Sequence, residues 1–579
     1  MLNPIDRQTE SELAAGIDSD ELDRHLEAFA GLERTAGSDD DWEASRYVTE
    51  TLEEYGVDAT LYEHEGYVSV PESAGVTVTT PTRREFEAIT VSFGASTPAA
   101  GVHGEIIHVE SFDDRNPRTD LDGKIAYVPG TPKPSVVTRA ERAGVAGVIF
   151  RSPNEHRYQG IVTPVWGTPS TDTADDVPDV PVVEVNRPDG EWLEDRLGHG
   201  PVEATLEASV TTELRSLPCP VGTIDGAESD RYLLVGNHVD SWFEGITDNA
   251  TAMAATLEIA RIVAARDEPL RRGLVFGFWS AHSTGRYAGS AWYADTNWLD
   301  LRDNCVVYLH IDLPGLQGAD SVWYQHMAEL EDEHLDAVRN ATELSLRDPE
   351  DTYLGSTGRP ARNSDQSFWG AGASSLLSGA RLDAGEGEGG PIGGGWWWHT
   401  PADTRDKADL DVLVEETKLY LALVGRICNS PALPHDFTAT VDDIGDALDA
   451  IESGADGAVN FDDLGQRLDR LRDRIARANA IMDDRAETDH TVRTDAEDLQ
   501  VTLGNVLNPA LYMEVPEYEH EPRKPYQQLP YLRIGEALPS LSGRERRFAE
   551  TKLQRGRVKL AHRLRRATRT ADEFLETHE

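Results

Sequence analysis

Two polar residues at the end of an apolar run carry the clearest chemical signal in this sequence. His238 and Asp240 close the segment Tyr-Leu-Leu-Val-Gly-Asn-His-Val-Asp, and Asp248 follows eight residues after Asp240. Far downstream, His399 stands in Trp-His-Thr-Pro-Ala-Asp-Thr. Imidazole nitrogens and carboxylate oxygens are ligands that suit zinc. The spacing predicts that these side chains share a divalent metal, and a metal-dependent hydrolase is the hypothesis that follows.

The segments around these residues alternate between apolar runs and longer helical stretches from residue 230 to about 430. The apolar runs are Tyr232 to Val235, Leu274 to Trp279, Val306 to Ile311 and Ser374 to Leu377. Such alternation is typical of a largely parallel sheet covered by helices on both faces. Ligands of these sheets bind outside the carboxyl ends of the strands. His238, His282 and Asp312 follow the first, second and third runs, so they are expected at that edge.

The remaining chain indicates further units around this α/β region. Residues 10 to 57 have helical spacing, and residues 96 to 208 contain short strands, one helix and many Pro and Gly turns. Beyond residue 430 the chain is again helical, and it ends in a long charged helix over 544 to 577. We therefore expect an α/β fold with an inserted β-rich domain and a C-terminal helical domain. The predicted boundaries are 1–95 for the first part of the α/β domain, 96–208 for the insertion, 209–430 for the metal-binding part and 431–579 for the helices.

The composition restricts the partners of the protein. The 579 residues include 104 acidic and 54 basic side chains, which gives a formal net charge of -50. A surface this acidic repels nucleic acids and anionic membranes. It also repels itself unless salt screens the charges. Because the charge is spread along the whole chain, we interpret it as adaptation to a high-salt cytoplasm.

The cysteines and the apolar segments bear on the compartment. Cys219, Cys305 and Cys428 form no close-spaced pair, which argues against a disulfide scaffold or a cysteine-type zinc site. The first residues contain no apolar signal core, and no apolar run reaches 18 residues. A cytoplasmic protein without a membrane segment is the expectation.

Taken together, these segments resemble the co-catalytic zinc exopeptidases, which include bacterial leucyl aminopeptidases, glutamate carboxypeptidase and the catalytically inactive transferrin receptor. Residues Arg34 to Ser38, followed by an amphipathic helix, resemble the N-terminal entry of that family. Residues 96–208 resemble its inserted protease-associated domain, and Ser364 to Trp369 resemble a segment lining its cleft. The helical C-terminus resembles the dimerisation domain of the glutamate-carboxypeptidase branch. The resemblance implies a homodimer and a peptide or related amide as substrate.

The resemblance also implies roles for individual residues. His238 and Asp312 would bind a first zinc ion, and His399 a second, with Asp248 bridging both. Asp240 would orient His238 and fix its tautomer. Two zinc ions are expected, with a single ion as the alternative. Ions about 3.5–4 Å apart polarise a carbonyl and lower the pKa of a shared water.

One segment departs from the family pattern. Active members carry a Glu-Glu pair after the second strand, the first acting as general base and the second as metal ligand. Here His282 and Ser283 occupy these two positions. Three outcomes stay open: His282 is the base; His282 replaces the missing ligand and Glu244 is the base; or the site is inactive.

Two classes of function follow from these alternatives. The first is an exopeptidase-like hydrolase, and the second is a binding or scaffold protein of the transferrin-receptor type. The presence of His238, Asp248, Asp312 and His399 together favours the enzyme. Arg362 and Arg381 are candidates for holding a substrate carboxylate. The sequence does not distinguish attack at the amino terminus of a substrate from attack at its carboxyl terminus.

Overall fold

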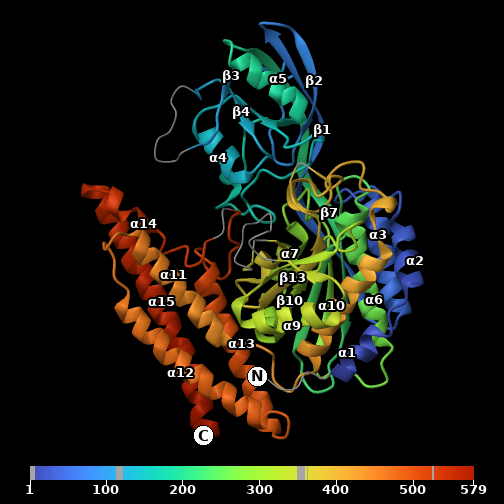
Figure 1. The fold of residues 1–579 in the computed structure, drawn as a ribbon, viewed down its shortest axis with the longest axis vertical. Helices are drawn as coiled ribbons and strands as arrows, with labels where there is room; N and C mark the ends of the chain where they lie inside the picture. The colour runs from blue at the N-terminus through green and yellow to red at the C-terminus, as the bar shows by residue number, and fades with distance from the viewer. Residues whose placement is uncertain (1–6, 113–120, 348–358, 361–362, 386, 524–526) are drawn as a thin grey trace.

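The computed structural model describes residues 7–112, 121–347, 359–360, 363–385, 387–523 and 527–579. Its described strands form one 13-stranded sheet, with helices on both faces of one half and a separate helical bundle beside it (Figure 1). The strand order is β1-β2-β6-β5-β4-β3-β7-β9-β8-β10-β13-β11-β12. The α/β class expected from the sequence is confirmed.

The half of the sheet that carries the metal-binding candidates has a parallel centre and antiparallel edges. Its four buried central strands are the four apolar runs of the sequence, and neighbours among them run parallel: β9 (Gly273–Trp279), β8 (Tyr232–His238), β10 (Cys305–His310) and β13 (Ser374–Arg381). On one side, β7 (Glu203–Ile224) pairs antiparallel with β9. On the other, β11 (Ser321–His326) pairs antiparallel with β13 and parallel with β12 (Ser345–Leu346).

Alternate residues of these strands enter two hydrophobic clusters on opposite faces of the sheet. Leu233 and Val235 join the larger cluster, whereas Tyr232 and Leu234 join the smaller one. The larger cluster is covered by α1 (Arg7–Ala14), α2 (Ser19–Phe29), α3 (Asp39–Glu54), α6 (Thr251–Ala264), α9 (Glu331–Ala341) and α10 (Leu410–Asn429). The smaller cluster is covered by α7 (Ala288–Thr296) and α8 (Trp298–Asn304). Burial on both faces holds the central strands in place and fixes the edge where they end.

A long two-stranded ribbon joins this sheet to the inserted unit. β1 (Asp58–Thr80) pairs antiparallel with β7 along almost its whole length. The far end of the ribbon pairs with β2 (Arg84–Thr90) and β3 (Val102–His108). Both ribbon strands run from one unit into the other, so residue 208, the predicted end of the inserted unit, lies inside β7.

The inserted unit is itself an α/β layer. Its strands β3, β4 (Ile125–Pro129), β5 (Gly147–Arg151) and β6 (Val182–Val185) pair parallel in that order. The helix expected in this unit is α4 (Pro134–Arg142), and the structure has another, α5 (Arg187–Leu197). Asn186 caps α5 and Pro188 stands in its first turn, a start signal that the strand-rich pattern around it obscured.

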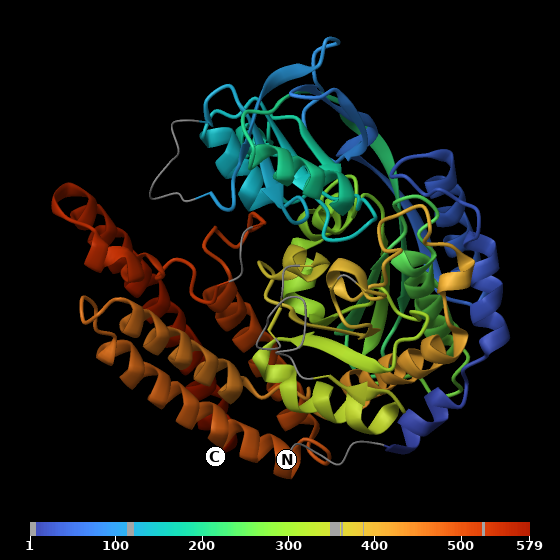
Figure 2. The same ribbon diagram turned by 45° about the horizontal axis from the view of Figure 1, so that its top comes forward.

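The C-terminal region is a helical bundle that lies beside the sheet (Figure 2). It consists of α11 (Phe437–Gly454), α12 (Asp462–Arg485), α13 (His490–Tyr512), the short α14 (Ile534–Ala537) and α15 (Gly543–His578). Leu464, Leu468 and Leu471, which repeat at helical spacing among charged residues, are buried in its core. None of the helices in the described ranges has both the length and the apolar composition needed to cross a bilayer.

Candidate metal centre

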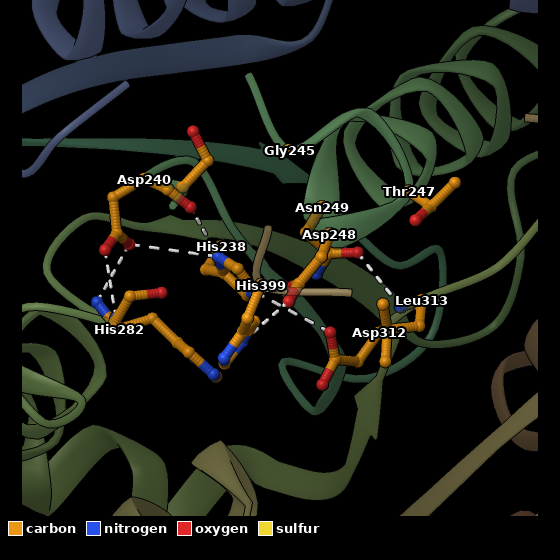
Figure 3. Close-up of polar contacts among 12 residues, drawn as sticks. His238, Asp240, Gly245, Thr247, Asp248, Asn249, His282, Asp312, Leu313 and His399 are labelled. Carbon is orange, nitrogen blue, oxygen red and sulfur yellow. Dashed lines mark hydrogen bonds and ion pairs between the residues drawn. The ribbon is translucent and has the colours of Figure 1, made fainter. Parts of the chain in front are cut away.

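The four predicted metal ligands converge at the carboxyl edge of the parallel strands (Figure 3). His238 is the last residue of β8, and Asp312 lies two residues beyond β10. Asp248 belongs to the turn Ile246–Ala250 that leads into α6. His399 comes from the loop between β13 and α10. Parallel strands bring these loops together because all of their carboxyl ends meet at one edge.

The carboxylate of Asp248 lies between two imidazoles. Its Oδ1 atom is 3.1 Å from Nε2 of His238, and its Oδ2 atom is 3.0 Å from Nε2 of His399. Each carboxylate oxygen therefore faces one histidine. This is the arrangement of a carboxylate that bridges two cation sites.

Asp312 completes a three-residue set on the His238 side. Its Oδ1 atom is 3.6 Å from Nε2 of His238 and is buried without a hydrogen-bond partner. Ligand atoms of His238, Asp248 and Asp312 all lie within 4.8 Å of one another. A buried carboxylate oxygen without a partner is costly, and a divalent cation at this point would satisfy it. The donor set of one imidazole and two carboxylates suits zinc.

The electrostatics of the cluster also favour a positive charge. Burial disfavours the charged form of His238, but the nearby carboxylates of Asp248 and Asp312 outweigh burial and raise the pKa of His238 to about 10. Burial alone would raise the pKa of Asp248, yet its bonds to His238 and His399 hold that pKa well below the usual value. A divalent ion can supply the charge that a proton supplies here.

Main-chain carbonyls set the orientation of both histidines. Nδ1 of His238 donates to the carbonyl oxygen of Asp240 at 2.8 Å, and Nδ1 of His399 donates to that of Gln159 at 2.7 Å. With Nδ1 protonated in each ring, Nε2 is left as the atom that faces Asp248. Such contacts fix the tautomer and ring direction of metal-binding histidines.

Asp240 contributes through its backbone and its side chain in different ways. The sequence led us to expect its carboxylate on His238, but that carboxylate lies 3.8 Å from Nδ1 of His238. It accepts hydrogen bonds from the backbone N–H groups of His282 at 2.8 Å and Ser283 at 2.9 Å. Asp240 therefore holds the loop after β9 against the end of β8.

His282 lies directly against the cluster. Its ring stacks on that of His238, with centroids 3.9 Å apart and planes 15° apart, and its Nδ1 atom is buried without a hydrogen-bond partner. Burial, reinforced by the charge on His238, holds the pKa of His282 well below its usual value. A neutral imidazole therefore stands where the family pattern has a glutamate.

Glu244, the other candidate base, contacts the site through its backbone. Its carbonyl oxygen accepts a hydrogen bond from Arg34 at 2.8 Å. Its carboxylate makes no hydrogen bond or ion pair within the part of the chain that the structure describes. Its backbone lies in the loop before Asp248, and the geometry leaves it a candidate.

Asp403 is a supporting residue to which we assigned no role from the sequence. Its Oδ1 atom accepts hydrogen bonds from the backbone N–H and the hydroxyl of Thr247, and its Oδ2 atom accepts one from the backbone N–H of Asp248. The buried carboxylate thus anchors the turn that presents the bridging carboxylate. The signal was available, because Asp403 ends the same His-Thr-Pro-Ala-Asp motif that contains His399.

Two buried arginines support loops rather than substrate. Arg34 donates to the carbonyl oxygens of Val239, Glu244 and Gly245, which shapes the loop after β8. Arg381, a candidate for substrate binding, donates instead to main-chain carbonyls, including that of Asp312 at 2.9 Å. Its donors are committed to positioning the Asp312 loop. Arg362 lies outside the described residues.

Comparison with known proteins connects this geometry with a family. Residues 221–424, which contain all four candidate ligands, match the model of peptidase family M28. The chain contains an M28 peptidase domain. This confirms the zinc-exopeptidase resemblance for the part of the chain that carries the candidate centre.

Individual relatives match the chain over short stretches. The chain is 32% identical to the aminopeptidase NAALADL1 of Rattus norvegicus over 123 residues, which are 20% of this chain and 16% of that protein. It is 32% identical to a probable glutamate carboxypeptidase, VP8, of Zea mays over 120 residues, 20% of this chain and 17% of that protein. The chain thus spans less than a fifth of the length of these curated relatives.

The fold of this chain is also similar to that of a solved structure. A zinc aminopeptidase from Bacillus subtilis, BSAP, is similar over 72% of this chain and 96% of its own, with a TM-score of 0.53 and 19% identity. At this identity the likeness concerns the fold. The covered share of the chain is larger than the 221–424 segment that matches the family model.

Proposed function

We propose that this protein is a metal-dependent hydrolase of the exopeptidase class that cleaves peptide or related amide bonds. The observation that carries the proposal is the carboxylate of Asp248, which faces Nε2 of His238 with one oxygen and Nε2 of His399 with the other. The names of the M28 relatives, an aminopeptidase and a probable glutamate carboxypeptidase, support the reaction class.

The residues present fit zinc, on the evidence of the unpartnered Asp312 oxygen and the mixed donor set. His238, Asp248 and Asp312 would hold the first ion. Asp248 and His399 would hold a second, for which Ser283 stands where the family has a carboxylate. Bound zinc supplies polarisation of the substrate carbonyl and activation of a water molecule.

The protein's own residues then have to move the proton of that water. His282 is our first candidate, because its neutral imidazole has an unpartnered Nδ1 atom beside the cluster. In the alternative, His282 replaces the missing carboxylate ligand and Glu244 is the base.

A scaffold without activity is the competing function. In such a protein nothing would require the four ligands, the two Nδ1 contacts or the Asp403 anchor to be kept together. Their joint presence favours the enzyme.

Metal analysis of purified protein in molar KCl tests the proposal. Asp248→Ala should lose all bound zinc, since both sites share this carboxylate, and should abolish hydrolysis of aminoacyl and peptidyl amides. Asp332→Ala is the control, because it removes an exposed carboxylate on α9. A full zinc content in Asp248→Ala would disprove the bridging role.

We also propose a homodimer formed through residues 431–579, and a cytoplasmic location. The dimer rests on the resemblance to the glutamate-carboxypeptidase branch. The location is supported by the three cysteines, which are buried and unpaired, as expected in a reducing compartment. Light scattering in molar KCl should give twice the mass of the chain, and a monomer at micromolar concentration would refute the dimer.

A further inference from the structure

Arg286 is a buried arginine with no acidic partner in the part of the chain that the structure describes. It lies in the loop between β9 and α7, and only 6% of its surface is exposed. Its Nε atom is buried and has no hydrogen-bond partner. Throughout the described ranges, its guanidinium forms neither a hydrogen bond nor an ion pair. An unpaired buried charge is unfavourable for stability, so its presence calls for a reason.

The other buried arginines of the described chain provide an internal comparison. Arg34 and Arg381 donate to main-chain carbonyl oxygens. Arg272 donates to carbonyl oxygens and pairs with Glu497, and Arg426 pairs with three acidic side chains. With 104 acidic residues in the chain, a carboxylate is available to most arginines. Among the described residues, Arg286 alone in this group has no hydrogen-bond acceptor for its guanidinium.

Two aromatic rings, those of Tyr287 and His282, separate Arg286 from the candidate ligand His238. Its guanidinium carbon lies 5.8 Å from the centroid of the Tyr287 ring. The Tyr287 ring lies 4.2 Å from that of His282, which in turn stacks on His238. Arg286 therefore shares the loop between β9 and α7 with His282, the residue that lies against the cluster.

The loop that carries Arg286 is held firmly. Arg286 and Tyr287 have positive φ angles of 50° and 66°, which non-glycine residues adopt only where their surroundings impose them. The backbone N–H of Tyr287 donates to the carbonyl of His282, and that of Gly167 donates to the carbonyl of Arg286 at 2.7 Å. The ring of Trp166 stacks on Tyr287 at 4.0 Å. The inserted unit and the M28 domain thus fix the loop together.

A second arginine, Arg523, acts on the charge of Arg286. Burial lowers the pKa of Arg286 to about 9; Tyr287 partly opposes this shift, and the nearby charge of Arg523 adds to it. The backbone N–H of Arg523 bonds to the carbonyl of Pro164, next to the Trp166 segment. An anion at this point would relieve both the burial cost and the repulsion.

We propose that Arg286 binds a carboxylate of the substrate, so that the protein selects peptides or amides with a free carboxylate close to the scissile bond. This inference rests on the proposed function. An arginine can bind a carboxylate through two parallel N–H···O bonds. A neutral amide in the same place would leave the buried charge unpaired, which is the situation in which enzymes discriminate most strongly.

Matched substrates test the carboxylate preference. The pair Leu-Ala and Leu-Ala-amide differs in a C-terminal carboxylate, and the pair Leu-Glu-amide and Leu-Gln-amide differs in a side-chain carboxylate. We expect the zinc-loaded wild type in molar KCl to prefer the acid of one pair by about 10- to 100-fold in kcat/KM, since a hydrogen bond to a charged group contributes about 1.5–3 kcal/mol. The pair that shows the preference identifies the source of the carboxylate.

Variants assign the preference to Arg286. Arg286→Leu should abolish it with an unchanged zinc content, and Arg286→Lys should keep part of it, because a lysine keeps the charge without the planar fork. Arg142→Leu, which removes an exposed arginine of the inserted unit, should behave as wild type. Equal kcat/KM for both members of each pair in the wild type, or a preference that survives in Arg286→Leu, would overturn the proposal.

Stability and binding separate this inference from the proposed function. Arg286→Leu should raise the melting temperature, because it removes an unpaired buried charge, whereas the loss of an arginine with a structural role would lower it. Calorimetric titration with the same peptides measures the preference without hydrolysis. If no peptide is cleaved but the acids bind more tightly in an Arg286-dependent way, the hydrolase proposal fails and the carboxylate site stands. If peptides are cleaved without a preference for the acids, the carboxylate site fails and the hydrolase proposal stands.

Discussion

Nδ1 of His399 donates a hydrogen bond to the main-chain carbonyl of Gln159, 2.7 Å away, and the backbone N–H of Gln159 donates to the carbonyl of His399 at 3.1 Å. Gln159 belongs to the inserted unit and His399 to the M28 domain. The two reciprocal bonds mean that one unit sets the ring direction of a candidate ligand in the other.

This relationship predicts that a backbone change at Gln159 weakens metal binding. Gln159→Pro removes the N–H that donates to the carbonyl of His399 and so loosens the segment whose carbonyl orients the His399 ring; the zinc affinity of the His399 side should fall by about 10- to 100-fold, the usual effect of disturbing a contact that orients a ligand. Gln159→Ala is the control, since it keeps both main-chain bonds. Zinc titration against a fluorescent chelator measures the affinity. Equal affinities in the two variants would show that the contact does not orient His399.

His282 stands where the family has a glutamate, and comparing two variants decides whether it is the base or a metal ligand. If His282 is the base, His282→Ala should retain its zinc and lose about 10²–10⁴ in rate, the usual contribution of general acid–base catalysis. If it is a ligand, His282→Ala should lose one zinc ion, and Glu244→Ala should instead lower the rate of peptide hydrolysis. Zinc stoichiometry and hydrolysis of one peptide are measured on both proteins. Unchanged zinc and unchanged rate in both variants would contradict either role and favour the scaffold.

The net charge of -50 predicts a stability that depends on salt. The Debye length falls from about 10 Å at 0.1 M salt to about 3 Å at 1 M, so the repulsion among surface carboxylates is largely screened in molar KCl. The melting temperature should rise steeply from dilute buffer to molar KCl. Sorbitol at matched osmolality should have a much smaller effect. A flat salt dependence would contradict the high-salt interpretation.

Glu184 predicts a pH dependence within the inserted unit. Its Oε1 atom accepts a hydrogen bond from the backbone N–H of Tyr158, its Oε2 atom is buried without a partner, and burial raises its pKa from 4.5 to about 8. Between these values the unfolded chain has lost the proton that the folded chain retains. The contribution of Glu184 is therefore fully present below pH 4.5 and is lost as the pH rises towards 8.

Glu184→Gln should remove this loss. Its stability relative to wild type should increase from pH 5 to pH 8, by up to about 1.4 kcal/mol per pH unit. Urea unfolding in molar KCl at several pH values measures the difference. Glu207→Gln, at an exposed glutamate of the same unit, should show no such trend. A constant difference between Glu184→Gln and wild type would contradict the raised pKa.

The sequence by itself determined the types of the candidate ligands and the elements that carry them. Apolar runs ending in His238 and near Asp312 predict buried parallel strands, and parallel strands place their carboxyl ends at one edge, so local pattern alone was sufficient to bring these residues together. The long final helix was equally predictable, and α15 spans Gly543–His578. Its small and apolar residues repeat at helical spacing among charges, which is a local property.

Only the tertiary structure decided how the loops at that edge support one another. The carboxylate of Asp240 contacts the loop of His282 rather than the ring of His238, and His399 takes its orientation from a carbonyl of the inserted unit. These partners are backbone groups, which every residue possesses, so no side-chain pattern marks them. The same holds for Arg286: an arginine in a sequence this acidic is expected to find a carboxylate, and only the tertiary structure shows it buried with no such partner among the described residues.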